Sequence, residues 1–290
     1  MKQFDWHGWR EMIPIERVRD PAPVVAVLRL DGVIGRGTHL GPALALANVA
    51  GRIARAFSIR RVKAVALVVN SPGGSPVQSA LIAGRIRALA AEKELSVYAF
   101  AEDVAASGGY MLLAAADTLY AHPSSIVGSI GVISSGFGFT EMIAKLGVER
   151  RLHTAGERKS LLDPFLPETD DDRERLKSIQ KELHENFKAY VRGRRQGKLS
   201  GAEDELFSGE FWTGTRAMEL GLVDGLGDIR TVLREKYGDR VKLRLVAEPR
   251  KWWRSRLRSL FPTAIDGGDT WADQLVDATE RRALWARFGL

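Results

Sequence analysis

The 290-residue sequence contains no cysteine. This absence excludes disulfide scaffolds, thiol nucleophiles, iron–sulfur clusters and cysteine-ligated zinc. Histidine is also scarce, and the five residues stand far apart without the spacing of a metal site: His7, His39, His122, His153 and His184. We therefore expect no metal and no cofactor, and interpret each histidine as an ordinary surface or core residue.

The sequence also lacks an apolar run long enough to span a membrane, which takes about 20 residues. The best candidate, residues 104–116, contains a serine and two glycines and is followed by Asp117. The first residues carry charges where a secretory signal needs an apolar stretch. We therefore expect a cytoplasmic chain with no transmembrane segment or signal peptide, and a peripheral position on the cytoplasmic membrane is the other option.

The composition, with 45% hydrophobic and 27% charged residues, is that of an ordinary globular protein. The net charge of +7 is spread over many residues, so it is weak evidence for a nucleic-acid or membrane partner. The sequence contains no recognisable nucleotide-binding loop. We expect no nucleic-acid partner.

The first half alternates apolar, β-branched runs with segments of helical periodicity. Strands are predicted at residues 24–30, 64–69, 96–101 and 118–121, and helices at residues 39–57 and 78–91. Apolar strands separated by helices are typical of a parallel sheet with helices on its faces. The pattern predicts one α/β domain.

Segments on either side of this pattern differ in character. A cluster of prolines ends an N-terminal arm, residues 1–22, and the predicted domain covers residues 23–247. Within the domain, Thr169 and an acidic first turn predict the start of a long charged helix over residues 170–195. A basic, Trp-rich extension follows at residues 248–290.

The stretch 250–261 of this extension interleaves Arg and Lys with Trp, Leu and Phe. This pattern predicts a basic amphipathic helix. Such a helix either contacts an anionic membrane surface or packs its tryptophans on a neighbouring subunit or on its own core.

Three glycine-rich elements follow strands, at residues 70–74, 107–109 and 128–131. In parallel α/β sheets, such turns meet at the carboxyl edge of the sheet. Ser107 precedes two glycines at a helix start, so a substrate can approach closely and free backbone N–H groups can stabilise a developing oxyanion. Gly74 can supply a second N–H, and the two would form an oxyanion hole for acyl transfer.

A serine nucleophile needs a base. No histidine here lies in a recognisable motif, but a lysine can serve when burial lowers its pKa from about 10.4 to 7 or 8. Serine–lysine pairs are a known variant of the catalytic triad. The composition does not show which lysine would act as the base.

Five motifs in order resemble those of the S49 peptidases, the signal peptide peptidase A family. They are Asn70–Gly74, Ala106–Tyr110, Val127–Val132, Gly156–Ser160 and Gly209–Asp224. NSPGG alone also occurs in the Clp protease subunit and in crotonase-fold proteins. The ordered set, with a lysine 52 residues after the serine, is specific and spans about residues 24–246. The single serine and lysine motifs resemble the short, single-unit family members.

The resemblance implies an α/β fold of the crotonase/ClpP type. It also implies that Ser107 is the nucleophile and Lys159 the general base, and that Ser129 hydrogen-bonds the lysine amine. Gly74 and Gly108 match the oxyanion-hole positions.

We therefore interpret the chain as a cofactor-free serine endopeptidase for short apolar peptides, such as remnant signal peptides. The family implies a homo-oligomer with shared active sites, and Lys159 can act within its own chain or across an interface. One alternative is a crotonase-fold enzyme acting on acyl-CoA thioesters, which would use carboxylates; Glu102 and Asp103 lie near Ser107 in sequence. The other is a non-catalytic peptide-binding scaffold.

Overall fold

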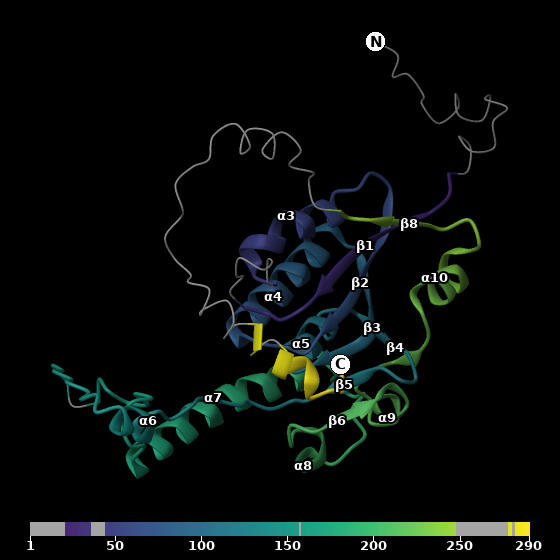
Figure 1. The fold of residues 1–290 in the computed structure, drawn as a ribbon. Helices are drawn as coiled ribbons and strands as arrows, with labels where there is room; N and C mark the ends of the chain where they lie inside the picture. Colours follow the sequence, from purple (N-terminus) through teal and green to yellow (C-terminus); the bar gives the residue numbers. More distant parts are fainter. Residues whose placement is uncertain (1–20, 36–43, 157, 248–277, 280–281) are drawn as a thin grey trace, which may run out of the picture.

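A central, mostly parallel sheet organises the molecule (Figure 1). The computed structural model describes residues 21–35, 44–156, 158–247, 278–279 and 282–290. The strands are β1 (Val24–Asp31), β2 (Val62–Ser71), β3 (Ser96–Ala106), β4 (Thr118–Ala121), β5 (Ile126–Gly128), β6 (Phe211–Thr213), β7 (Gly225–Leu226) and β8 (Lys242–Leu245). They lie in the order β6-β5-β3-β2-β1-β8, with β4 between β3 and β7.

The long strand β3 has two partners on one edge. Its first part pairs with β4, from Tyr98↔Thr118 onward, and its last three residues pair with β5, ending at Ala106↔Gly128. Among the described strands, only β6 runs antiparallel to its neighbour, β5. This pairing brings the ends of β3 and β5 side by side.

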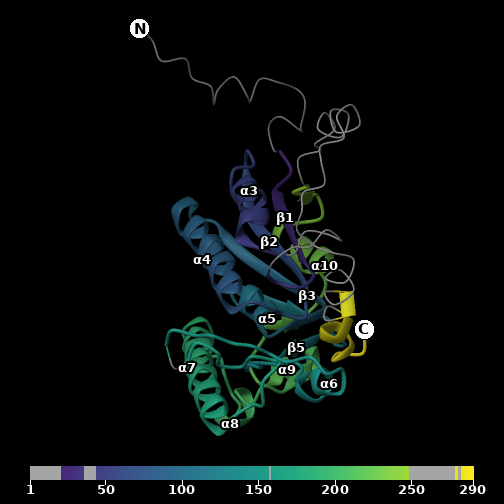
Figure 2. The same cartoon turned by 60° about the vertical axis from the view of Figure 1, so that its left-hand side comes forward.

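Helices cover both faces of the sheet (Figure 2). Helices α3 (Leu46–Phe57), α4 (Pro76–Lys93) and α5 (Gly108–Leu113) cover one face, and α10 (Ile229–Tyr237) covers the other. Along β1, Ala26 and Leu28 belong to the core between the sheet and helices α3, α4 and α5. Val25 and Val27 belong to the core on the other face, with α10. Strands buried on both sides explain the near-continuous apolar runs in the sequence.

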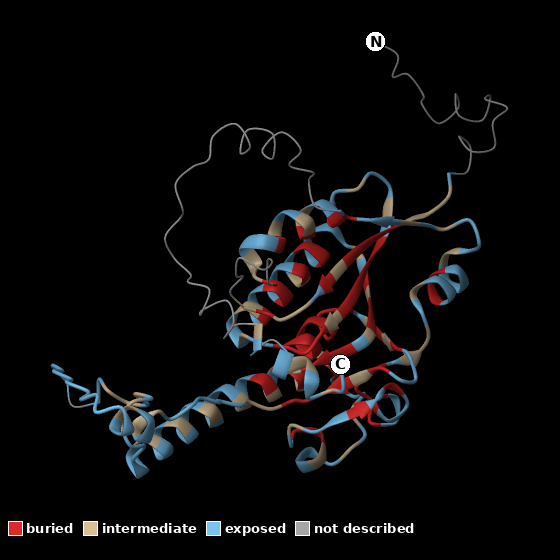
Figure 3. Cartoon of the chain, viewed as in Figure 1, coloured by how far each residue is buried: buried red, intermediate tan, exposed pale blue. Residues whose placement is uncertain are grey.

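Helix α7 (Asp170–Arg194) extends beyond the sheet. It begins with a capping box, in which Thr169 and Asp172 exchange hydrogen bonds between side chain and backbone. Its C-terminal half packs on the domain through Phe187 and Val191, while its start and α6 (Thr140–Lys145) are largely exposed (Figure 3). We call residues 133–169 the arm. The short helices α8 (Glu203–Leu206) and α9 (Gly214–Glu219) flank β6.

An ion pair between a buried arginine and a partly exposed aspartate attaches the end of α7 to the sheet. The Arg195 side chain is 1% exposed and donates to both Asp224 carboxylate oxygens (2.9 and 3.0 Å) and to the Gly221 carbonyl. Asp224 also accepts from the Leu119 N–H of β4 and from Lys198. Burial alone would raise the pKa of Asp224, but these hydrogen bonds outweigh it and lower the pKa.

Most predicted elements are confirmed, with two differences. The predicted helix at 39–57 starts only at Leu46, because Leu44 pairs with Ile34 and Ala45 is extended; residues 36–43 lie outside the described residues. The strand predicted to end at residue 101 continues to Ala106, where β5 adds a partner beyond the end of β4. The predicted helix at 250–261 and most of the N-terminal arm also lie outside the described residues. No described helix combines the length and apolar character needed to cross a bilayer.

Candidate active site

Ser107 lies at the junction between β3 and α5. Its backbone has φ 52° and ψ −121°, a conformation that suits glycine and costs a residue with a side chain about 1–3 kcal/mol. The Ser107 N–H donates to the carbonyl of Gly128 (2.8 Å), which fixes the serine beside the end of β5. Its hydroxyl caps no helix N–H and has no partner among the described side chains. The junction therefore presents a free hydroxyl on a strained backbone.

Glycines make the close approach at this junction possible. Gly74 has φ 138°, and a Cβ there would overlap the carbonyl of Ile34. A Cβ on Gly109 would overlap the carbonyl of Ser71, so β2 and α5 meet backbone to backbone. These contacts explain why glycine follows both strands.

Two residues with available backbone donors line the same hollow as Ser107. Gly74 and Gly108 line it together with the serine. Gly108 is the first residue of α5, where an N–H has no acceptor within the helix. Neither N–H donates to another backbone group in the described part of the chain. Such a pair of donors can stabilise an oxyanion next to the serine.

Ser129 occupies the matching position after β5. Its φ is 54°, it is 5% exposed, and its N–H donates to the carbonyl of Glu210 (2.7 Å). Because Ala106 pairs with Gly128, Ser107 and Ser129 follow directly from paired residues. Within the described structure, the Ser129 hydroxyl has no hydrogen bond.

The hollow beside Ser107 has a volume of about 480 Å³ and a mostly apolar lining. Parts of this lining come from distant segments and were not predicted from the sequence: Phe187 and Tyr190 of α7, and Leu284 and Arg287 near the C-terminus. Tyr190 donates to the Met111 carbonyl (3.0 Å), and burial raises its pKa to about 12, so it stays neutral. No local pattern marks these residues, since their role comes from tertiary packing.

Lys159 is not brought to Ser107 in the single chain. It lies exposed in a turn of the arm, where its N–H donates to the Gly156 carbonyl (3.2 Å), and it does not line the hollow. The arm extends away from the sheet with the start of α7 (Figure 1). A lysine needs burial to act as a base. In the described part of one chain, Ser107, Gly74 and Gly108 therefore line one hollow, and Lys159 lies outside it.

His184 is a further residue that sequence reasoning did not assign to the site. Its Nε2 lies 3.0 Å from the carbonyl of Ile130, the residue after Ser129. Histidine on α7 thereby holds the turn that carries Ser129. A helical histidine without a motif gives no sequence signal for this contact.

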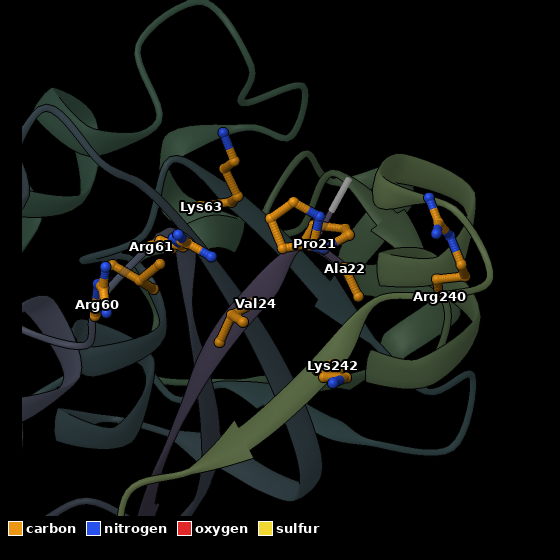
Figure 4. Close-up of a pocket in the computed structure, with 10 residues that line it drawn as sticks. Pro21, Ala22, Val24, Arg60, Arg61, Lys63, Arg240 and Lys242 are labelled. Atoms are coloured by element: carbon orange, nitrogen blue, oxygen red, sulfur yellow. The ribbon is translucent and has the colours of Figure 1, made fainter. Parts of the chain in front are cut away.

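Another hollow lies away from Ser107. A larger hollow of about 880 Å³ holds Arg60, Arg61, Lys63, Arg240 and Lys242 (Figure 4). It surrounds the first residues of β1 and β2, at the opposite end of the strands from Ser107, and contains none of the predicted site residues.

Among the residues that the structure describes, no three His, Asp or Glu side chains gather as a metal site.

Comparison with known proteins agrees with the fold and the motifs. The model of peptidase family S49 matches residues 89–242. A putative signal peptide peptidase SppA from Enterococcus faecium is 33% identical over 169 residues, 58% of this chain and 48% of that protein. The 1510-N membrane-bound stomatin-specific protease, solved as a variant with a substrate peptide, has a TM-score of 0.52 at 14% identity and covers 82% of this chain and 99% of that one. This likeness confirms the α/β fold of the crotonase/ClpP type.

A relative with higher sequence identity to this chain carries the name of an antiporter and not of a peptidase. A Brucella abortus protein named Na(+)/H(+) antiporter NhaA is 49% identical over 290 residues. The match covers 97% of this chain but only 39% of that protein, and the chain spans about half of the Enterococcus relative. The S49 match, by contrast, falls on the segment that includes Ser107, Ser129 and Lys159. The chain belongs to peptidase family S49.

Proposed function

We propose that the protein is a serine endopeptidase in which Ser107 is the nucleophile and Lys159 the general base. The observation that carries this proposal is the junction at Ser107. A free hydroxyl on a strained backbone stands at an apolar hollow, which is also lined by two glycines whose N–H groups have no backbone acceptor in the described structure.

The chemistry follows the usual course of acyl transfer. The unprotonated Lys159 amine takes the Ser107 proton while the serine oxygen attacks the peptide carbonyl carbon. The N–H groups of Gly74 and Gly108 stabilise the tetrahedral oxyanion. The lysine then protonates the leaving amine, and water hydrolyses the acyl-enzyme with the lysine again as base. The Ser129 hydroxyl accepts a hydrogen bond from the amine and orients its lone pair.

This mechanism requires that assembly bury Lys159 next to a serine. The arm exposes apolar side chains that a monomer would leave in water: Ile133, Phe137, Met142, Leu146, Val148, Leu152 and Leu162. Exposed apolar patches of this kind mark interaction surfaces. We infer that the arm docks on a second copy of the chain and that Lys159 serves the Ser107 of that neighbour.

Short apolar peptides, such as remnant signal peptides, are the substrates that we propose. The hollow is mostly apolar, and the solved neighbour was captured with a substrate peptide. The 1510-N protease was solved both as a variant with a serine replaced by alanine and as one with a lysine replaced by alanine, the residue types that the proposed dyad needs.

The acyl-CoA alternative is less well supported. The carboxylates near Ser107 in sequence have structural partners: Glu102 accepts from Arg29 (2.6 Å) and Asp103 from Asn70 (2.8 Å). Neither lines the hollow.

We also propose that the domain covers residues 23–247 and that the protein is cytoplasmic. Contact of residues 250–261 with a membrane is a further proposal.

Peptide cleavage by variants tests the dyad. We expect Ser107→Ala and Lys159→Ala each to lower kcat/KM for an apolar fluorogenic peptide at least about a hundredfold. Ser135→Ala, on the lining of the same hollow, and Lys145→Ala, on the arm, are the matched controls. Wild-type turnover of acyl-CoA without peptide cleavage would favour the crotonase alternative, and peptide binding without either activity would favour the scaffold.

Mixing the two inactive variants tests the shared site. If Lys159 serves a neighbouring chain, co-assembled Ser107→Ala and Lys159→Ala subunits form some sites with both residues intact. Activity then returns on mixing. Two folded, co-assembled variants that stay inactive together would contradict a dyad formed across the interface.

A further inference from the structure

The C-terminal segment, residues 282–290, lies against the candidate active site (yellow in Figure 1). The Phe288 ring packs edge-on against Phe211, with centroids 5.1 Å apart. Phe211 belongs to β6 and pairs with Gly128, the residue before Ser129. Residues 282–286 form a short helix, and Gly289, with φ 79°, ends the turn that follows it. The segment is thus anchored on the strand next to the turn that carries Ser129.

One face of this segment borders the Ser107 hollow. Leu284 and Arg287 are three residues apart, so they lie on the same side of the helix, and both line the hollow. Leu284 continues the apolar lining. Arg287 is different, because it is the one charged side chain among the described residues that form the lining.

No carboxylate of the described chain neutralises Arg287. Its guanidinium lies 5.8 Å from the ring centroid of the adjacent Phe288, and no acidic residue lines the hollow. An apolar peptide alone gives this cation no partner. Arg287 is exposed at the edge of the hollow, where a substrate can reach it. Arginine binds carboxylates through paired hydrogen bonds.

We propose that the C-terminal segment forms the outer wall of the Ser107 hollow and that Arg287 selects peptide substrates that present a carboxylate there. The carboxylate belongs either to the free C-terminus of a short peptide or to an Asp or Glu side chain near the scissile bond. This inference rests on the proposed peptidase function and adds a specificity determinant to it.

Two pairs of fluorogenic peptides with one apolar sequence test the selection. The first pair ends in a free carboxylate or an amide, and the second carries Glu or Gln beside the scissile bond. We expect the wild type to cleave the carboxylate member of one pair with a kcat/KM about five- to tenfold higher, as for one charge-assisted contact. The pair that shows the preference identifies the source of the carboxylate.

Variants assign the preference to the residue. Arg287→Gln should abolish it and Arg287→Glu should reverse it, whereas Arg282→Gln, in the same segment but off the lining, should leave it intact. Higher ionic strength should weaken it. Phe288→Ala removes the anchor, so the preference should also fall in that variant while the unfolding temperature changes little.

Equal cleavage within both pairs by the wild type would overturn the inference and leave the peptidase proposal standing. A loss of preference in Arg282→Gln as large as in Arg287→Gln would also overturn it. If the wild type cleaves no peptide, the proposed function fails separately. The inference is then tested by fluorescence anisotropy with labelled peptides and the full-length Ser107→Ala variant, and equal affinity for carboxylate and amide peptides would contradict it.

Discussion

Replacing Ser107 by glycine and by alanine separates backbone strain from catalysis. Both variants remove the hydroxyl, so both should lose activity. Only glycine can adopt φ 52° and ψ −121° without strain. The difference in unfolding free energy between the two variants therefore reports the strain stored at the junction.

The expected difference follows from two opposing effects. A side chain in this backbone region costs about 1–3 kcal/mol. Glycine loses more conformational freedom on folding, which offsets about 0.5–1 kcal/mol of that gain. The Ser107 hydroxyl caps no helix N–H, so its removal costs no capping hydrogen bond in either variant. We expect Ser107→Gly to be more stable than Ser107→Ala by about 1 kcal/mol, or about 2 °C in Tm.

Urea unfolding and calorimetry of the two variants measure this difference. The same pair of substitutions at Ser135, which is exposed and has no positive φ, is the control and should favour alanine or show no difference. If Ser107→Gly is less stable than Ser107→Ala, the backbone at the junction is unstrained in solution and the reasoning is refuted.

Three further predictions concern the packing around the site. Arg195→Met removes the buried guanidinium but leaves Asp224 with Lys198 and the Leu119 N–H, so it should cost about 1.5–3 kcal/mol in urea unfolding, as for hydrogen bonds to a charged group. A loss below about 0.5 kcal/mol would show that the pair is dispensable. Because the folded-state pKa of Asp224 is lowered, its contribution to stability is present above about pH 4 and is lost as the pH falls through that lowered value. Asp224→Asn should therefore flatten the acid limb of the stability profile, and an unchanged limb would contradict this. His184→Ala should lower kcat about tenfold by releasing the turn at Ile130, with partial rescue in His184→Gln; equal rates in the three proteins would remove its positioning role.

The sequence predicted those parts of the fold that depend on local patterns. Apolar runs identified the parallel strands, and Thr169 with its acidic neighbours marked the start of α7. The sequence did not predict the features that depend on strand pairing. The pairing of Leu44 with Ile34 delays α3, and β5 extends β3 up to Ser107, and both depend on segments distant in sequence.

The candidate site was predictable to a similar extent. Gly74, Ser107 and Gly108 belong to motifs that follow strands, so their convergence could be expected from a parallel sheet. Arg287 and His184 could not be assigned, since a helix face has no partner until the tertiary structure is known. In the single chain, Lys159 lies in the exposed arm, and its approach to a serine across an interface is our proposal.

Covalent labelling with a serine-reactive fluorophosphonate probe, mapped by peptide mass spectrometry on the assembled protein, tests the dyad most directly. We predict one labelled residue, Ser107, and strongly reduced labelling of the same residue in Lys159→Ala at neutral pH. Labelling at another serine, or equal labelling with and without the lysine, would contradict a lysine-activated nucleophile at the end of β3.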